Sequence, residues 1–229
     1  MELRDIYELI EKSIVNRSDE RPLEYLFTWL NLTMITSLLT PIKSWIKILD
    51  VGGSESRLAK TLAELGFDVT VIDINDVEHG DAKFVRENIL EFEFPEEEFD
   101  IIVAISTIEH IGLPAYGQKL IDSDGDVKTM HKIYRWLKSG GVAIVTLPYG
   151  KPHHPPQFER VYDEKTLKER IIKDKWNVVS ILYACKDGRW DICSELKARD
   201  RDACVFLVLQ KPIKKGSRKI MFKLHMCAL

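Results

Sequence analysis

A turn of small residues near position 50 is the first segment whose residue types suggest ligand binding. Residues 48–56 read ILDVGGSES, an apolar stretch that runs into glycines and serines. Small side chains let a ligand approach the backbone, and the start of a following helix offers free amide donors. The segment lacks the GxxxxGK[ST] phosphate loop, and of the G-x-G-x-x-G dinucleotide fingerprint only Gly52 fits. Asp50, two residues before Gly52, would attract an ammonium group and repel a pyrophosphate.

Asp73 is the second candidate, because it ends the next apolar stretch, 21 residues after Gly52. In nucleotide-binding α/β sheets an acid at this point receives the ribose hydroxyls. A ribose and an ammonium group on one ligand, without phosphate, suggest S-adenosylmethionine. Asp50 and Asp73 together therefore favour this cofactor.

Three histidines are candidates for proton transfer. His110 follows the apolar stretch 99–105, at the carboxyl end of a predicted strand, where open α/β sheets place their ligands. It would take a proton from an acceptor hydroxyl; the alternative is that it packs at the start of a helix and orients a loop. His153 and His154 follow the next predicted strand in a loop that prolines stiffen. One of them is the second candidate for the base, and the alternative is a surface loop with solvated imidazoles.

Hydrophobic periodicity predicts the elements that must position these residues. Residues 1–46 are expected to be helical, with one apolar stripe formed by Leu23, Phe27, Leu30, Met34 and Leu38. Strands are predicted over residues 46–51, 69–73, 83–86, 99–105, 142–147, 176–184 and 203–210. Helices are predicted over residues 58–65, 127–137 and 163–172, with Asp126 as the cap of the second. This alternation predicts a parallel sheet with helices on both faces, and an antiparallel pair formed by the last two strands.

Composition limits the class of protein. A chain of 229 residues, 45% of them apolar, is long enough for one large domain with a full core, which excludes disorder and a small disulfide scaffold. The net charge of −3 argues against general nucleic-acid binding. The four cysteines form no CxxC pair, which argues against a zinc site and suggests a reducing compartment. Cys185, Cys193 and Cys204 are expected to be ordinary thiols.

Two segments raise the question of a membrane. The uncharged run 26–42 is expected to be a buried helix, because it is polar and short for a span, and no secretory signal opens the chain. The last 19 residues carry six positive charges and no acid. They form either a solvated tail or a weak contact with an anionic partner or lipid surface.

Over residues 45–210 the sequence resembles the class I S-adenosylmethionine-dependent methyltransferases. The first motif of this family, an acid, a spacer and G-x-G-x-G, corresponds to residues 50–56, where serine replaces two of the three glycines. Asp73 corresponds to the family's second-strand acid. Residues 84–100 are similar to its third motif, residues 101–111 to its fourth strand with a Glu-His pair, and residues 137–147 to its LKPGG turn and fifth strand.

The resemblance implies a set of cofactor contacts. Ile74 would pack on the adenine, and the Asn88 carbonyl would accept a hydrogen bond from the adenine amine. The implied cofactor-binding residues are Asp50, Gly52, Gly53, Ser54, Asp73, Ile74, Asn88, Ile89, Ile105 and Ser106. Some relatives bind a divalent metal through Glu-x-x-Glu-His, but Ser106 replaces the first of these acids, so no metal is expected.

The resemblance also implies a fold and an activity. We expect a Rossmann-like sheet of seven strands, the last antiparallel, in a methyltransferase domain over residues 47–210, with a helical extension at 1–46 and a basic tail at 211–229. Residues 109–127 are similar to a subgroup found among cell-surface glycan biosynthesis genes, which implies methyl transfer to a hydroxyl of a sugar or small metabolite. We expect a cytoplasmic monomer or homodimer.

Other functions stay open at this point. DNA base methylation is not expected, because residues 105–108 read ISTI where such enzymes carry [DN]-P-P-[YFW]. One alternative is a non-catalytic module that binds S-adenosylmethionine as a regulator or partner subunit, which the serine-substituted first motif favours. The other is a nicotinamide-dependent oxidoreductase, against which Asp50 and the missing third glycine argue.

Overall fold

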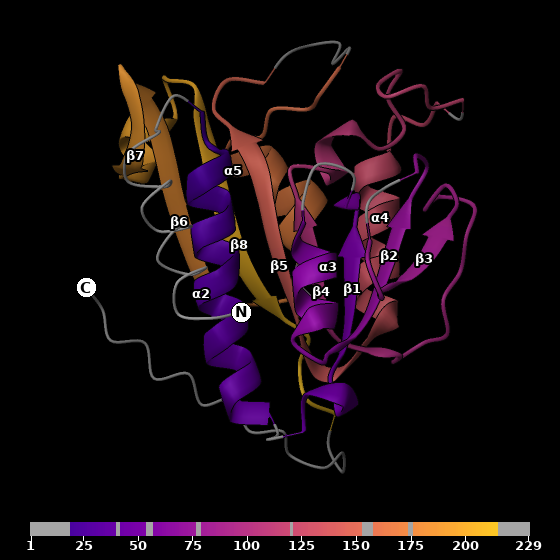
Figure 1. Ribbon diagram of the computed structural model, residues 1–229. Helices are drawn as coiled ribbons and strands as arrows, with labels where there is room; N and C mark the ends of the chain where they lie inside the picture. The colour runs from indigo at the N-terminus through magenta and orange to yellow at the C-terminus, as the bar shows by residue number, and fades with distance from the viewer. Residues whose placement is uncertain are drawn as a thin grey trace.

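One mixed sheet forms the centre of the fold, with the strand order β3-β2-β1-β4-β5-β8-β6-β7 (Figure 1). The computed structural model describes residues 19–39, 42–53, 57–76, 79–119, 121–152, 158–173 and 176–214. The strands are β1 (Lys47–Val51), β2 (Asp68–Asp73), β3 (Lys83–Arg86), β4 (Phe99–Ile105), β5 (Leu137–Tyr149), β6 (Asn177–Asp187), β7 (Arg189–Cys193) and β8 (Ala203–Gln210). Strands β1 to β5 pair in parallel, whereas β8 runs antiparallel between β5 and β6. The predicted antiparallel pairing of the last two predicted strands is therefore confirmed.

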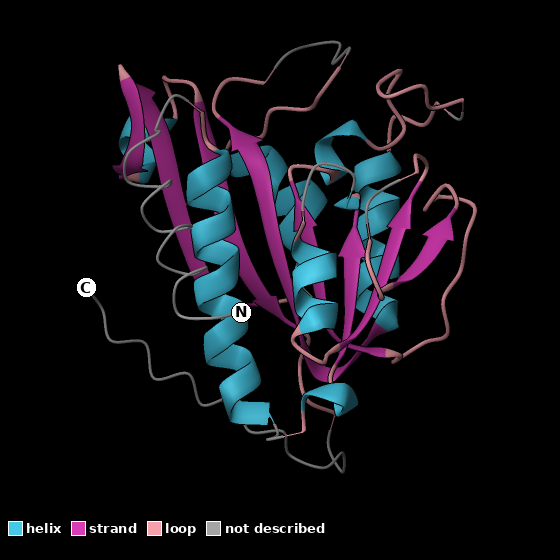
Figure 2. Cartoon of the chain, in the orientation of Figure 1, coloured by secondary structure: helices cyan, strands magenta, loops and turns pink. Residues whose placement is uncertain are grey.

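Helices cover both faces of the sheet (Figure 2). The helical segments are α2 (Arg21–Leu39), η1 (Lys43–Trp45), α3 (Leu58–Glu64), η3 (Ile108–His110), α4 (Gly125–Trp136), α5 (Glu164–Thr166), η4 (Leu167–Ile172) and α6 (Glu195–Ala198). Side chains of α2 and α3 pack in one apolar cluster, and those of α4 and η4 pack in another on the opposite face. Strand β4 contributes side chains to both clusters, because Ile101 and Val103 belong to the first cluster and Ile102 belongs to the second. This explains the continuous apolar run of this strand.

The sheet has eight strands in the described part of the chain, not the seven expected. The additional strand is β7, which pairs antiparallel with the end of β6. Gly188 makes the turn between them with a φ of +75°, a conformation that glycine adopts without strain. Residues 185–193 lack a clear alternation of apolar and polar residues, so the sequence does not predict this hairpin.

The prediction that Cys185, Cys193 and Cys204 are ordinary thiols is wrong for two of them. Cys185 and Cys193 form a disulfide, with a Cα–Cα distance of 5.9 Å. The hairpin is the physical reason, because the antiparallel register pairs Cys185 with Asp191 and Tyr183 with Cys193, which brings the two cysteines to diagonal positions. Cys204 stays a free, buried thiol on β8.

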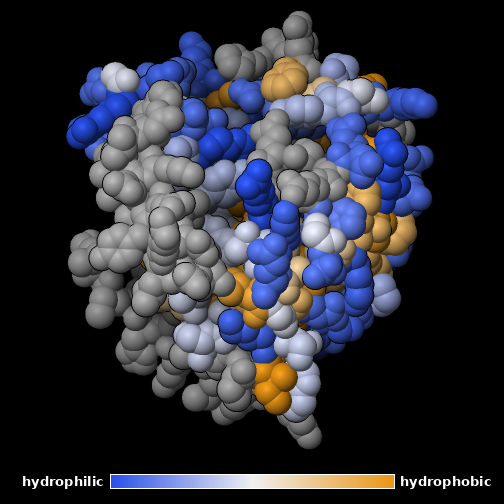
Figure 3. All heavy atoms as spheres, in the orientation of Figure 1, coloured by the Kyte–Doolittle hydropathy of each residue, from blue (hydrophilic) through white to orange (hydrophobic). Residues whose placement is uncertain are grey.

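The apolar stripe predicted for the first helix is only partly correct. Leu23 and Phe27 are buried, but Leu30 and Met34 are 53% and 52% exposed, respectively. The buried face turns instead toward Leu32 and Ile35, and it includes the polar Glu24 and Thr28, both fully buried. The side chain of Leu38 lies outside the described residues. Among the described residues on the face seen in Figure 1, hydrophilic side chains lie between separate hydrophobic patches (Figure 3).

Two further predictions about helix boundaries are corrected. Asp126 does not cap α4: the helix begins at Gly125, its N-cap is Asp124, and no side-chain cap bond forms. Asp126 is instead buried and accepts a hydrogen bond from Tyr162. The helix ends at Trp136, one residue before the predicted end, because Leu137 already belongs to β5.

The described part of the chain contains no helix that meets the length and hydropathy needed to cross a membrane.

The start of the basic tail is part of the fold. Lys211 is buried and its Nζ donates to the Leu137 carbonyl, while Lys214 forms an ion pair with Glu97. Residues 215–229 and 1–18 lie outside the described part.

Candidate functional site

A cavity of about 90 Å³ lies at the carboxyl ends of β1, β2 and β4. This is the edge at which open α/β sheets bind ligands. Its wall includes seven of the ten predicted cofactor residues: Gly52, Asp73, Ile74, Asn88, Ile89, Ile105 and Ser106. His110 also lines it. Asp50 and Gly53 do not, and Ser54, His153 and His154 lie outside the described residues.

Gly52 lets the backbone after β1 lie against the loop after β4. Its φ is +74°, and its amide donates to the Ile72 carbonyl at 2.9 Å. A Cβ at this position would overlap the Thr107 side chain. Gly53 packs inward, where a Cβ would lie 2.9 Å from Val71 Cγ1 and 3.1 Å from a carboxylate oxygen of Asp50. Asp50, only 2% exposed, therefore lies beneath the turn and not in the cavity wall.

Short local hydrogen bonds hold the polar groups at β2 and β3. The Asp73 carboxylate accepts a bond from the Asn75 amide at 2.8 Å, and the Asn88 side-chain carbonyl accepts one from the Leu90 amide at 3.0 Å. Each bond spans two residues, which is the Asx-turn pattern. A carboxylate keeps further lone pairs for a ligand after one such bond, and so does an amide carbonyl.

Ser106 connects the cavity wall to the N-terminal helix. Its φ is +41°, and its hydroxyl donates to Glu24 Oε1 at 2.5 Å. Glu24 is fully buried, and Arg21, which also lines the cavity, lies 3.5 Å from its other oxygen. Burial raises the pKa of Glu24 above its usual range.

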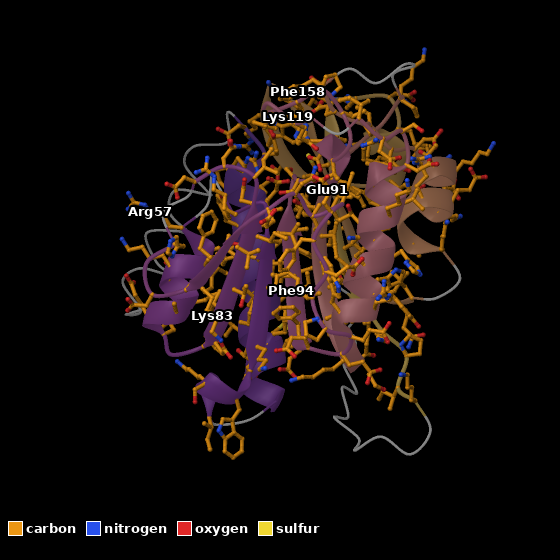
Figure 4. The ribbon with its side chains drawn as sticks, turned by 90° about the vertical axis from the view of Figure 1, so that its right-hand side faces the viewer. Arg57, Lys83, Glu91, Phe94, Lys119 and Phe158 are labelled. Carbon is orange, nitrogen blue, oxygen red and sulfur yellow. A yellow bond between two sulfur atoms is a disulfide. The ribbon has the colours of Figure 1, made fainter. Side chains whose placement is uncertain are left out.

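His110 is held on several sides. It is 6% exposed, and its Nδ1 donates to the Phe158 carbonyl at 2.8 Å. The Tyr116 and Phe158 rings pack edge-on against the imidazole, with centroids at 5.0 and 4.8 Å. Glu109 Oε1 lies 3.8 Å from Nε2, and burial raises the pKa of this carboxyl well above its usual range. Phe158 and Lys119 lie at the same end of the molecule (Figure 4).

The sequence did not mark Arg21, Glu24 and Arg160, which reach this site from distant segments. It also did not mark Thr107 and Gln118, which lie near predicted site residues in the chain. Gln118 donates to the His110 carbonyl at 2.8 Å, and Arg160 donates to the carbonyls of Glu109 and Ile111. The sequence pattern could have marked Glu24, because this acid falls beside Leu23 and Phe27 on the apolar side of the helix. Arg160 carries no such signal, since its hydrogen-bond acceptors around His110 are backbone carbonyls.

Residues 22–174 match the methyltransferase domain family. The match spans more than half of the chain, which therefore belongs to this family. The expected methyltransferase is confirmed at the level of the family. The narrower resemblance to the glycan-biosynthesis subgroup stays a prediction.

Solved structures show the same fold. An S-adenosylmethionine-dependent methyltransferase of Methanosarcina mazei is 16% identical, covers 79% of this chain and 98% of its own, and has a TM-score of 0.56. The 1,6-didemethyltoxoflavin-N1-methyltransferase of Burkholderia thailandensis, with its substrate and S-adenosylhomocysteine bound, is 14% identical over 90% of this chain and 87% of its own, with a TM-score of 0.53. The N-methyltransferase NodS of Bradyrhizobium japonicum, in complex with S-adenosylhomocysteine, is 16% identical over 90% and 98%, with a TM-score of 0.52. No curated protein matches the sequence.

Proposed function

We propose that the cavity binds S-adenosylmethionine and that the protein transfers its methyl group to a hydroxyl of a small molecule or sugar. The observation that carries the proposal is the joint placement of Gly52, Asp73 and His110 in one cavity of a chain that belongs to the methyltransferase domain family. The structural neighbours named above bind S-adenosylhomocysteine in two cases, and one of them holds a small-molecule substrate.

The residues present fit this cofactor. Asp73 stands at the end of β2, where its carboxylate would receive the ribose hydroxyls. The apolar side chains of Ile74, Ile89 and Ile105 line the same cavity and would enclose the adenine. Gly52, whose backbone can approach a ligand closely, would lie against the methionine part, for whose carboxylate Arg21 would be a cationic partner.

The bound cofactor would supply an activated methyl group on a sulfonium, which is already a good leaving group. The chain would therefore act mainly by aligning the acceptor and excluding water. A hydroxyl acceptor loses its proton during the reaction, and His110 would take that proton at Nε2. Nδ1 is not available for this role, because it donates to the Phe158 carbonyl.

The acceptor class rests on one argument. The sequence resembles the glycan-biosynthesis subgroup over residues 109–127, and this segment contributes His110, Tyr116 and Gln118 to the cavity wall. The cytoplasmic location and the oligomeric state stay predictions. The predicted weak contact of the basic tail with an anionic partner would depend on residues 215–229, because Lys211 and Lys214 have partners within the fold.

Calorimetric titration of the full chain with S-adenosylhomocysteine, with NAD as the control, tests the cofactor. Saturable binding of S-adenosylhomocysteine alone is the expected result. Binding of NAD alone would revive the oxidoreductase alternative, and binding of neither ligand would contradict the proposed cavity.

A screen of sugars and hydroxylated metabolites, read as release of S-adenosylhomocysteine, then tests the reaction. With an acceptor in hand, His110→Gln should lower kcat by about 10²–10⁴ and leave the affinity for S-adenosylhomocysteine unchanged. A variant that keeps the wild-type kcat would remove His110 from the role of base. Cofactor binding without turnover on any acceptor would favour the non-catalytic module.

A further inference from the structure

We propose that Arg160 is a positioning residue that holds His110 as the neutral ring with its lone pair on Nε2. The inference deepens the proposed function and rests on it, because a base at this position must present an unprotonated nitrogen. Arg160 does not line the cavity, so it would act through His110 and not on a ligand.

The Arg160 guanidinium holds the backbone on both sides of His110. Its NH1 group donates to the carbonyls of Glu109 and Ile111 at 3.1 and 2.8 Å, and the Arg160 amide also donates to the Glu109 carbonyl. Its NH2 group donates to the carbonyls of Asp122 and Ser123 at 3.1 and 3.2 Å. The planar fork of arginine allows these bonds to form together, whereas a lysine ammonium is a single point charge.

The same segment determines which imidazole nitrogen carries the proton. Phe158, two residues before Arg160, accepts the Nδ1 hydrogen bond of His110 through its backbone carbonyl. A carbonyl oxygen only accepts, so Nδ1 carries the hydrogen and the neutral ring has its lone pair on Nε2. The Phe158 ring also packs edge-on against the imidazole, which opposes rotation of the ring. The end of the molecule that carries Phe158 is seen in Figure 4.

A second set of contacts, on the side away from His110, holds the Arg160 side chain in place. It is 6% exposed, and its Nε lies 3.6 Å from Asp126 Oδ1. The fully buried Asp126 also accepts bonds from the Tyr162 hydroxyl at 2.9 Å and from Arg170 at 2.6 and 2.8 Å. Residues 158–162 are thus tied both to α4 and to the backbone around His110. Movement of this segment would shift the Phe158 carbonyl and the His110 backbone together.

The test is nuclear magnetic resonance of the full chain with ¹⁵N-labelled histidine, in complex with S-adenosylhomocysteine. The chain has six histidines, and the signal missing from His110→Gln assigns the site. Spectra are taken at about pH 8.5, some two units above the ordinary histidine pKa. We expect a protonated Nδ1 and an unprotonated Nε2 for His110 in the wild-type protein. We expect Arg160→Lys to lose this signature, as a mixture of the two tautomers or a broadened signal.

The matched control is Arg199→Lys. Arg199 is exposed and pairs with the carboxylates of Glu164 and Glu195, which lysine can also do. This variant should keep the His110 signals of the wild type. Both variants should bind S-adenosylhomocysteine within about twofold of the wild type, since neither arginine lines the cavity.

Each outcome decides something different. A wild-type His110 that carries its proton on Nε2 would overturn the proposal even if Arg160→Lys does not fold. Unchanged His110 signals in a folded Arg160→Lys variant would show that Arg160 is only structural. Loss of S-adenosylhomocysteine binding in the wild type would instead contradict the proposed function, and titration detects that failure separately.

Discussion

The two walls of the cavity differ in how far apart along the chain their hydrogen-bonded residues lie. At β2 and β3 the polar groups of Asp73 and Asn88 are fixed by bonds that span two residues. At β4 and β5 the corresponding bonds span 82 residues from Ser106 to Glu24 and 48 from His110 to Phe158. We call the first the cofactor wall and the second the acceptor wall, after the roles proposed for Asp73 and for His110.

The difference separates what folds locally from what needs the complete fold. An Asx turn forms within a short segment, so the cofactor wall can be assembled once β1 and β2 pair. The acceptor wall needs α2, η3, α4 and the segment after β5 to be in place at once. It also buries charged groups, which persist only when partners from distant segments surround them. Four variants test this comparison.

Asp126→Ala should have the largest effect, and it should act on stability. The change removes the buried carboxylate that binds both the Arg170 guanidinium and the Tyr162 hydroxyl. We expect this loss to lower the free energy of unfolding by about 3–5 kcal/mol. Urea unfolding measures it. Asp124→Ala is the control, because Asp124 also pairs with Arg170 but is exposed, and it should cost less than about 1 kcal/mol. Equal losses would mean that the acceptor wall is not a cooperative buried network.

Gly52→Ala probes the cofactor wall. The new Cβ would overlap Thr107 and a φ of +74° would be strained, so we expect a loss of about 2–4 kcal/mol in stability. We also expect at least a tenfold loss, about 1.4 kcal/mol, in affinity for S-adenosylhomocysteine. Gly66→Ala is the matched control, since Gly66 has a φ of +90° with nothing within 4 Å of its Cβ position. It should lose about 1 kcal/mol of stability and no affinity. Wild-type affinity in Gly52→Ala would place the ligand elsewhere.

Asp73→Ala sharpens the assignment of the ribose site. Lost hydrogen bonds to a charged group should weaken S-adenosylhomocysteine binding by about 1–3 kcal/mol, as measured by calorimetry. Asp68→Ala serves as the control, because Asp68 starts the same strand and pairs with Lys83 at the opposite edge of the sheet. Its affinity should equal that of the wild type. A smaller loss for Asp73→Ala than for Asp68→Ala would mean that the cofactor has been placed at the wrong edge.

Glu109→Gln should have the smallest effect near pH 4.3, and the effect should grow as the pH rises. Burial raises the pKa of Glu109 in the folded protein, so the unfolded chain ionises first as the pH rises above about 4.3. The wild type therefore loses stability relative to Glu109→Gln as the pH rises toward the folded-state pKa, by at most about 1.4 kcal/mol per pH unit. Unfolding in urea at several pH values measures this difference.

Glu97→Gln provides the control of opposite sign. The hydrogen bond from Lys214 lowers the pKa of Glu97, so the stability it contributes is present above the unfolded-state pKa and lost as the pH falls through the folded-state pKa. The contribution should stay under about 1 kcal/mol, because the pair is solvent-exposed. A stability difference between Glu109→Gln and the wild type that does not change with pH would mean that Glu109 is not a buried, titrating carboxyl.

The predictions that held are those with local causes. Strands over 83–86, 99–105 and 203–210 were predicted to the residue, because each is a β-forming run between polar segments. The prediction failed where contacts between elements decide. Leu30 and Met34 share the helical spacing of Leu23 and Phe27, yet α2 packs on β4, β5 and β8 with a face turned toward Glu24 and Thr28.

The alternating order of strands and helices, the family and most residues of the cofactor wall could be predicted from the amino-acid sequence. Apolar periodicity, glycine turns and short Asx bonds depend on neighbours in the chain, so no coordinates are needed to recognise them. The hairpin that joins Cys185 to Cys193, the burial of Asp126 and the arrangement of Arg160 around His110 depend on contacts between distant segments. Arg160 binds backbone carbonyls, which every residue carries, so no residue pattern marks its partners before the chain has folded.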